Sequence, residues 1–321
     1  MTPPASAGTP TLPLPGPRVE WAALPPARTT ADGVRVLAGV PYAGLPGARP
    51  LELDLWLPAA PGTAATAVPA VVFLHGGGWR LGSRHSVGPA YAGESPSPLE
   101  RLARSGIAVA SVDYRLSGEA VFPAQLHDAK AAVRWLRARA PELGIDPDRI
   151  AAWGESAGGH LAELLGLTAG HPVLEGAVGV DGSAGELSSS VAAVVAWYAP
   201  SDVAAVAADA GADPLDATTR EAQLLGAPAA AVPDRAALAS PIGHVHPSAP
   251  PMLLLHGRAD RFVSCRQSER LHAALVAAGV GAQLHLYDDA DHMWLGATDA
   301  AADAVTRTMT FLHHHLRGEH P

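Results

Sequence analysis

A serine at position 156 has the sequence setting of a nucleophile. It lies in the segment WGESAGGH (residues 153–160), where an apolar run leads into a G-x-S-x-G pattern and then into a helix-forming stretch. A chain that reverses between a strand and a helix needs small side chains, which Gly154 and Gly158 supply. Such a turn raises the hydroxyl above the sheet and points the following N–H groups at an anion forming there. The pattern therefore predicts nucleophilic attack by Ser156.

A serine hydroxyl is a poor nucleophile at neutral pH, so it needs a histidine base and a carboxylate that orients the base. Asp260 and His292 each follow an apolar strand-like run, and they come after Ser156 in the order serine, acid, histidine. That order is typical of serine hydrolases built on a parallel sheet. Asp202, which also follows a strand-like run, is the main rival for the acid.

Attack on a carbonyl creates an oxyanion, and losing one hydrogen-bond donor to it costs about 3–4 kcal/mol. The segment HGGGW (residues 75–79) follows an apolar strand, and glycine there lets backbone N–H groups approach a substrate oxygen. We expect the donors to be the N–H groups of Gly77, Gly78 and Ala157. Trp79 and Trp294 adjoin these loops, and we expect them to wall the substrate pocket.

The elements that must position these residues alternate between strand and helix from about residue 34 onward. This alternation predicts a mostly parallel, eight-stranded sheet with helices on both faces. We expect strands at residues 34–40, 51–57, 70–75, 107–112, 149–153, 191–197, 252–256 and 282–287. Helices are expected at residues 123–139, 157–168, 265–278 and 298–315. The first two strands should pair at one edge, with 51–57 half exposed because apolar and polar residues alternate along it.

The domain organisation follows from the same pattern. Residues 1–31 hold eight prolines and read as an extended arm without the cationic and apolar regions of a secretory signal. Residues 32–321 should form a single α/β domain. Residues 200–250 are the least regular part, with a helix-like patch at 220–225, and are expected to form a short cap-like insertion over a pocket.

Composition excludes several classes of function. The net charge of −9 argues against nucleic acid as a partner, and no apolar run is long enough to cross a membrane. The single cysteine, Cys265, permits no internal disulfide, so a cytoplasmic location is expected. Fifteen histidines show no zinc-binding spacing, so neither a metal nor a cofactor is expected. Homo-oligomer formation is left open.

Five motifs occur in the order found in one superfamily. They are HGGGW (75–79), DYR (113–115), GESAGGHLA (154–162), HG at 256–257 followed by Asp260, and DH (291–292). With them the chain resembles the α/β-hydrolases over residues 34–312, and more narrowly the hormone-sensitive-lipase-like carboxylesterases with their feruloyl- and acetylxylan-esterase-like bacterial branch. Glu155 stands where the lipase-like group often has Asp.

The resemblance implies a single α/β-hydrolase domain over residues 32–321 with a Ser156–Asp260–His292 triad. It also implies an oxyanion hole from the loop at residues 76–78 and a two-step acyl-enzyme mechanism without metal. The expected function is a serine carboxylesterase acting on a small-molecule substrate, a short-chain or aryl ester. An arylformamidase-like amide hydrolase and a non-catalytic ligand-binding member of the fold are the alternatives. His160 is expected to pack or hydrogen-bond, and the DYR segment to brace the oxyanion loop.

Overall fold

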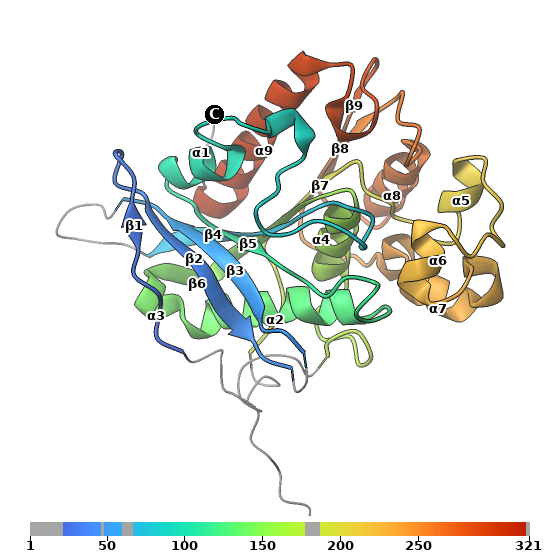
Figure 1. Cartoon of the computed structure of the whole chain (residues 1–321). Helices are drawn as coiled ribbons and strands as arrows, with labels where there is room; N and C mark the ends of the chain where they lie inside the picture. Colours follow the sequence, from blue (N-terminus) through green and yellow to red (C-terminus); the bar gives the residue numbers. More distant parts are fainter. Residues whose placement is uncertain (1–21, 46–47, 60–66, 177–186, 319–321) are drawn as a thin grey trace, which may run out of the picture.

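The computed structural model describes residues 22–45, 48–59, 67–176 and 187–318, and these residues build one twisted sheet (Figure 1). Within them the sheet has nine strands in the order β1-β2-β3-β5-β4-β6-β7-β8-β9. The strands are β1 (Arg28–Thr29), β2 (Arg35–Ala43), β3 (Leu51–Leu57), β4 (Val68–Leu74), β5 (Ala108–Val112), β6 (Ile145–Glu155), β7 (Val194–Trp197), β8 (Met252–Gly257) and β9 (Ala282–Tyr287).

The sheet is antiparallel at one edge and parallel elsewhere. Strands β1, β2, β3 and β5 pair antiparallel, whereas β5, β4, β6, β7, β8 and β9 run parallel. The prediction of a mostly parallel α/β sheet is confirmed, as is the edge pairing of the first two predicted strands. The parallel strands all present their carboxyl ends at one edge, where ligands bind in open α/β sheets.

The predicted number of eight strands is one too few. The additional strand, β1, consists of only Arg28 and Thr29, which pair with Arg35 and Val36 at the outer edge of the sheet. These two residues belong to the expected proline-rich arm, whose residues 1–21 lie outside the described part of the chain. A two-residue strand has no periodicity, so no pattern in the sequence could reveal it.

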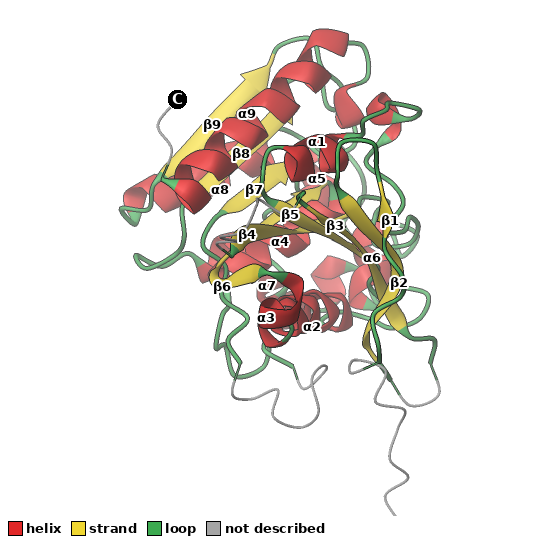
Figure 2. Cartoon of the chain, turned by 90° about the vertical axis from the view of Figure 1, so that its left-hand side faces the viewer, coloured by secondary structure: helices red, strands yellow, loops and turns green. Residues whose placement is uncertain are grey.

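Helices cover both faces of the sheet, as Figure 2 shows from the side. One face packs against α1 (Pro98–Arg104) and α9 (Thr298–Arg317), and the other against α2 (Ala124–Ala138), α3 (Ala140–Leu143), α4 (Ala157–Leu167) and α8 (Arg266–Ala277). The strands between these layers are apolar on both faces, and all five residues of β5 are buried. Such doubly covered strands are typical of parallel sheets.

Strand β3 is more buried than its alternating sequence predicts. Asp54 was expected to face solvent but is only 6% exposed. Its carboxylate accepts a hydrogen bond from the backbone N–H of Gly39 at 2.8 Å and pairs with the Arg84 side chain at 2.9 Å. The half-exposed prediction holds at Glu52 and Trp56, which are partly exposed, and is wrong at Asp54, because an ion pair with a following loop covers that carboxylate.

The insertion at residues 200–250 forms short helices beyond the carboxyl ends of the strands, at the right in Figure 1. It contains α5 (Val206–Asp209), α6 (Arg220–Leu225), α7 (Pro233–Leu238) and two 3-10 turns, Ala229–Ala231 and Pro241–His244. The helix predicted at 220–225 coincides with α6. The side chain of Thr219 caps it by accepting a hydrogen bond from the N–H of Ala222.

A bilayer-spanning helix would need about 20 predominantly apolar residues. None of the helices in the described part of the chain meets that requirement.

Candidate active site

Ser156 lies at a sharp turn between β6 and α4, with the backbone angles φ 51° and ψ −117°. The turn brings backbones so close that the neighbouring positions accept only glycine. A Cβ on Gly158 would lie 2.0 Å from the carbonyl oxygen of Leu74, and one on Gly154 would lie 2.2 Å from the oxygen of Gly158. The motif thus holds a strained serine at the start of a helix, as its spacing predicts.

Ser156 and His292 are joined by a hydrogen bond across the carboxyl edge of the sheet. The distance from Ser156 Oγ to His292 Nε2 is 3.0 Å, and His292 Nδ1 lies 2.6 Å from Asp260 Oδ2. A carboxylate can only accept, so Nδ1 carries the proton and Nε2 is left to accept from the serine hydroxyl. The structure therefore brings together the three residues predicted as nucleophile, acid and base.

Asp260 is held as an anion by several donors. Its Oδ1 accepts from the backbone N–H groups of Phe262 at 2.9 Å and Val263 at 2.8 Å, while its Oδ2 faces His292 and also lies 3.3 Å from His256 Nε2. Burial alone would raise the pKa of Asp260, but the hydrogen bonds from the two histidines outweigh it and hold the pKa well below its usual value. The carboxylate stays ionised beside His292.

The rival acid, Asp202, lies away from His292. Its carboxylate has Arg270 Nε at 3.9 Å, and its backbone N–H donates to Gln267. Asp291, which precedes the histidine, accepts a hydrogen bond from the backbone N–H of His292 at 2.7 Å and pairs with Arg261. Of these carboxylates, only that of Asp260 is bonded to the imidazole ring.

The glycine loop borders the same site. Gly77 and Gly78 have φ of 117° and 61°, and both line the cavity in front of Ser156. Within the described residues, neither glycine donates its N–H to another part of the chain. Ala157 is the first residue of α4, so its N–H has no acceptor within the helix. Gly77 and Gly78 thus border the cavity and Ala157 directly follows Ser156, while the role of the three N–H groups as an oxyanion hole stays a prediction.

The DYR segment contacts this loop from behind. The Tyr114 hydroxyl donates to the carbonyl of His75 at 2.8 Å, and the two rings stack with centroids 4.3 Å apart. Asp113 accepts from the backbone N–H of Arg84 at 2.8 Å and from its side chain. The segment therefore fixes both the start of the glycine loop and the chain that follows it.

The cavity at Ser156 has a volume of about 220 Å³. Its walls include five residues that the sequence did not single out for the pocket, namely Arg80, Leu81, Arg220, Phe262 and Met293. Tyr198 and Glu155 also line it, and the Tyr198 ring packs edge-on against His292 with centroids 4.8 Å apart. Among the lining residues that the sequence analysis did not name, Tyr198 is the one whose place could have been inferred, since it directly follows a strand of the parallel sheet.

The two tryptophans predicted for the pocket do not line it. Trp79 and Trp294 are each 2% exposed and belong to the two hydrophobic cores. The Trp79 indole donates to His160 Nδ1 at 3.2 Å, and the Trp294 ring packs on Tyr198 at 4.7 Å. Both residues have positive φ, 58° and 63°, at the turns of their loops. Burial of a large apolar ring decides their position despite the neighbouring motif.

Glu155 connects three segments around the serine. One carboxyl oxygen accepts from the backbone N–H groups of Gly76 at 3.3 Å and Gly88 at 3.0 Å, and the other accepts from the Tyr198 hydroxyl at 2.8 Å. Burial raises the pKa of Glu155, and these three hydrogen bonds oppose the rise. The side chain thus ties the glycine loop to the tyrosine that packs against His292.

His160 has the packing role that the sequence predicts. Its Nε2 donates to the carbonyl of Ala239 at 2.7 Å, and its Nδ1 accepts from Trp79. Burial lowers the pKa of His160 to about 4, so the ring is neutral near pH 7. It joins the glycine loop, α4 and the insertion.

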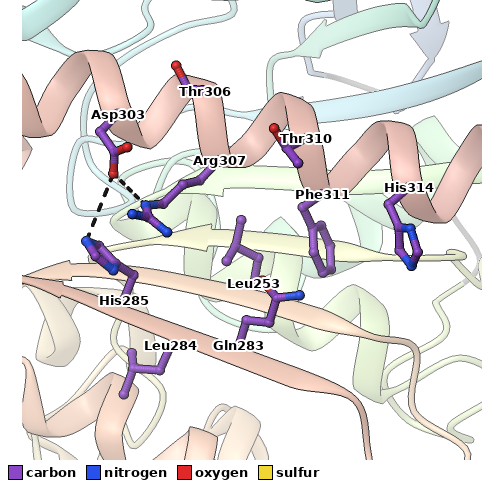
Figure 3. Close-up of a pocket in the computed structure, with 10 residues that line it drawn as sticks. All are labelled: Leu253, Gln283, Leu284, His285, Asp303, Thr306, Arg307, Thr310, Phe311 and His314. Atoms are coloured by element: carbon purple, nitrogen blue, oxygen red, sulfur yellow. Dashed lines mark hydrogen bonds and ion pairs between the residues drawn. The ribbon is translucent and has the colours of Figure 1, made fainter. Parts of the chain in front are cut away.

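A second, larger cavity of about 570 Å³ lies far along the sheet, between α9 and the edge strand β9 (Figure 3). Asp303 there pairs with Arg307 and has His285 Nε2 at 4.0 Å. No serine or cysteine lines this cavity. We therefore assign the candidate chemistry to the smaller cavity, which contains Ser156 and His292.

No cluster of three or more histidine, cysteine, aspartate or glutamate side chains in the described ranges has the arrangement of a metal site. His244, one of the histidines considered as a ligand, donates a hydrogen bond from Nε2 to the carbonyl of Leu238 at 2.9 Å, and its ring packs on that of His171. The absence of a metal and of a cofactor stays a prediction.

Comparison with known proteins gives a family and several relatives. The BD-FAE family model matches residues 53–275. Esterase LipQ of Mycobacterium tuberculosis is 31% identical over 269 residues, which are 83% of this chain and 56% of the relative. Carboxylesterase NlhH of the same organism is 42% identical over 100 residues, 30% of this chain and 28% of that one. The chain spans about half the length of the first curated relatives that it matches.

Solved structures share the fold over most of the chain. A truncated carbohydrate esterase from gut microbiota superposes with a TM-score of 0.74 and 30% identity, covering 90% of this chain and 99% of that one. Esterase 2 of Thermogutta terrifontis with propionate bound gives a TM-score of 0.66 and 26% identity, covering 87% and 93%.

Proposed function

This chain belongs to the BD-FAE family and has the α/β-hydrolase fold, and from that membership we propose that it hydrolyses carboxylic esters through a serine nucleophile. One observation carries the proposal. The hydrogen-bonded series Ser156, His292, Asp260, with distances of 3.0 and 2.6 Å, opens into a cavity bordered by Gly77 and Gly78.

The proposed reaction has two steps. His292 accepts the Ser156 proton as the oxygen attacks the ester carbonyl, and the N–H groups of Gly77, Gly78 and Ala157 stabilise the resulting oxyanion. The C–O bond to the alcohol breaks, and His292 gives its proton to the leaving oxygen. Water then attacks the acyl-enzyme with His292 again as base, which releases the acid and restores Ser156.

Short acyl groups and aryl alcohols are the proposed substrates. A cavity of about 220 Å³ is small for a substrate site, and Phe262 offers an aromatic surface beside His292, with ring centroids 5.6 Å apart. The structure of the Thermogutta terrifontis relative with propionate bound supports a short acyl group by analogy.

The test is hydrolysis of p-nitrophenyl esters from acetyl to palmitoyl by the wild type and by Ser156→Ala, with formanilide as the amide substrate. We expect turnover of the short esters and a loss on the order of 10⁵-fold or more in Ser156→Ala, with unchanged thermal unfolding. Substantial esterase activity in a folded Ser156→Ala variant would contradict the serine mechanism. Preferential cleavage of formanilide would favour the amide hydrolase, and no turnover of either by the folded wild type would favour a binding protein.

A further inference from the structure

Two arginines from separate segments border the cavity that contains Ser156. Arg80 follows the glycine loop, and Arg220 is the first residue of α6 in the insertion. The Arg220 guanidinium carbon lies 5.1 Å from the centroid of the Phe262 ring. A Cβ on Gly78 would lie 2.7 Å from Arg220 Cδ, so the arginine stem crosses directly over the proposed oxyanion loop. The positive charge is thus held beside the reacting groups.

Neither arginine has an anionic partner in the described part of the chain. Arg80 donates to the neutral side chain of Gln223 at 3.3 Å, and Arg220 contacts the Phe262 ring. The nearby Arg84 differs, because it pairs with three carboxylates, each 2.9 Å away or closer. In a chain of net charge −9, two arginines without a carboxylate at one cavity are a local excess of positive charge.

The carboxyl groups of the site do not neutralise them. Glu155 lines the cavity but uses both oxygens on Tyr198 and two backbone N–H groups. Asp260 is bonded to His292 and its side chain is completely buried. The guanidinium of Arg220 therefore remains available to an anion that enters with the substrate.

The rim beside Arg220 is apolar. Leu81 is 65% exposed and Phe262 43% exposed, and both line the cavity. Exposed large apolar side chains around a concave site mark a surface for a ligand. Their position beside a guanidinium suits a flat apolar group that carries a negative charge, because a guanidinium binds carboxylates through two parallel hydrogen bonds.

We propose that Arg220 selects esters that carry a carboxylate on their acyl or alcohol part. The inference rests on the proposed ester hydrolysis and names its substrate class. The Arg220 side chain would bind the carboxylate, while Leu81 and Phe262 contact the apolar body of the substrate. A purely structural role, in which Arg220 only attaches the insertion to the Phe262 ring, is the alternative.

Two substrates separate these roles. 4-Acetoxybenzoate and 4-acetoxybenzamide share the acetyl group and the aromatic ring, and only the first carries a carboxylate. The readout is the ratio of their kcat/KM values in the wild type, Arg220→Met and Arg266→Met. The methionine side chain of Arg220→Met retains an apolar stem over Gly78 and lacks the charge. Arg266 is exposed on α8 and does not line the cavity, so it controls for the loss of one positive charge.

We expect Arg220→Met to lower the ratio of anionic to neutral turnover roughly ten- to hundredfold, because a charge-assisted hydrogen bond is lost. Arg266→Met should leave the ratio unchanged. A second readout is the inhibition of p-nitrophenyl acetate hydrolysis by benzoate, with benzamide as the uncharged comparison. Arg220→Met should weaken inhibition by benzoate more than inhibition by benzamide. This readout does not depend on whether the acyl or the alcohol part of a substrate carries the charge.

The inference would be overturned if a folded Arg220→Met variant kept the wild-type ratio of kcat/KM for the anionic and neutral substrates. It would also be overturned if this ratio fell equally in Arg220→Met and Arg266→Met. A proportional fall in kcat/KM for both substrates in Arg220→Met would favour the structural role and would also count against the inference. Failure of the proposed function looks different. In that case the wild type would show no Ser156-dependent turnover of either acetate.

Discussion

Asp260 has both carboxyl oxygens occupied, and only one of them by His292. The N–H groups of Phe262 and Val263 hold the other oxygen, and His256 approaches from the buried side. The Val263 carbonyl, 2.8 Å from His256 Nε2, requires that nitrogen to carry a proton. His256 is therefore a positioning residue that keeps the acid ionised and aimed at His292.

At the residue scale we predict that Asp260→Asn lowers kcat on the order of 10⁴-fold, because the amide can donate to His292 Nδ1 and favour the wrong tautomer. Steady-state kinetics with p-nitrophenyl acetate measures the effect. Asp202→Asn is the matched control, since its carboxylate lies away from the imidazole, and it should retain most of the activity. A larger loss in Asp202→Asn than in Asp260→Asn would reverse the assignment of the acid.

The sequence predicted the residues that meet at the site better than those that shape the pocket. Ser156, Asp260 and His292 each follow a strand, so their order and the parallel topology indicated that they would converge. Trp79 and Trp294 were placed wrongly, because adjacency in sequence does not show to which side of a loop a ring turns. Arg220 and Phe262 could not be found, since they stand in segments whose course depends on tertiary packing.

At the scale of elements, the glycine loop depends on backbone shape more than on side chains. Gly77 has φ of 117°, and a Cβ there would lie 2.2 Å from the carbonyl oxygen of Leu81. Backbone atoms cannot move aside as a flexible side chain can, so the loop must change its course to accept any other residue.

We predict that Gly77→Ala lowers kcat at least about 10²-fold, because the displaced loop no longer presents its N–H groups to the oxyanion. Gly93→Ala is the control. Gly93 also has positive φ, 81°, but a Cβ there would meet nothing within 4 Å. It should cost some stability and little activity in the same ester assay. If both variants lost the same activity, the strain of positive φ would explain the effect and the oxyanion role would lose its support.

The predicted strands and helices agree with the structure where the hydrophobic pattern in the sequence extends over many residues. The interior strands and the helices from 123, 157, 265 and 298 were found within a few residues. Strand β6 extends back to Ile145, ahead of the predicted start at residue 149, and its register with β4 shifts between Val68 and Ala70. An irregular pairing of this kind depends on the neighbouring strand, which no local sequence signal contains.

At the scale of the whole molecule, a buried acid on α4 affects stability. Glu163 is 0% exposed, and neither of its carboxyl oxygens has a hydrogen-bond partner within the described residues. Burial raises the pKa of Glu163 well above its usual value of 4.5, and a nearby Ser201 hydroxyl opposes this only in part. The side chain is therefore neutral in the folded protein over a pH range in which it is ionised in the unfolded chain.

Because the folded-state pKa is the higher one, the contribution of Glu163 to stability is full below about pH 4.5 and declines as pH rises toward the folded-state value. We predict that Glu163→Gln removes this decline. The unfolding free energy of the variant, relative to the wild type, should increase with pH by up to about 1.4 kcal/mol per unit.

Urea denaturation at several pH values between 4.5 and 8 measures this difference. Glu94→Gln, at an exposed position, is the control and should follow the wild type. If the unfolding free energies of Glu163→Gln and the wild type changed in parallel with pH, Glu163 would have to ionise equally in the folded and unfolded chains.

The proposed nucleophile and base, Ser156 and His292, are 136 positions apart in the chain. Their contact requires β9 to pair with β8 at the far edge of the sheet, and β9 follows every other strand of this sheet in chain order. A growing chain can form the glycine loop and the serine turn early, because domains fold progressively from the N-terminus during synthesis. It gains the proposed base, His292, only after β9 has emerged. Nascent chains should therefore remain catalytically silent until β9 and His292 have left the ribosome.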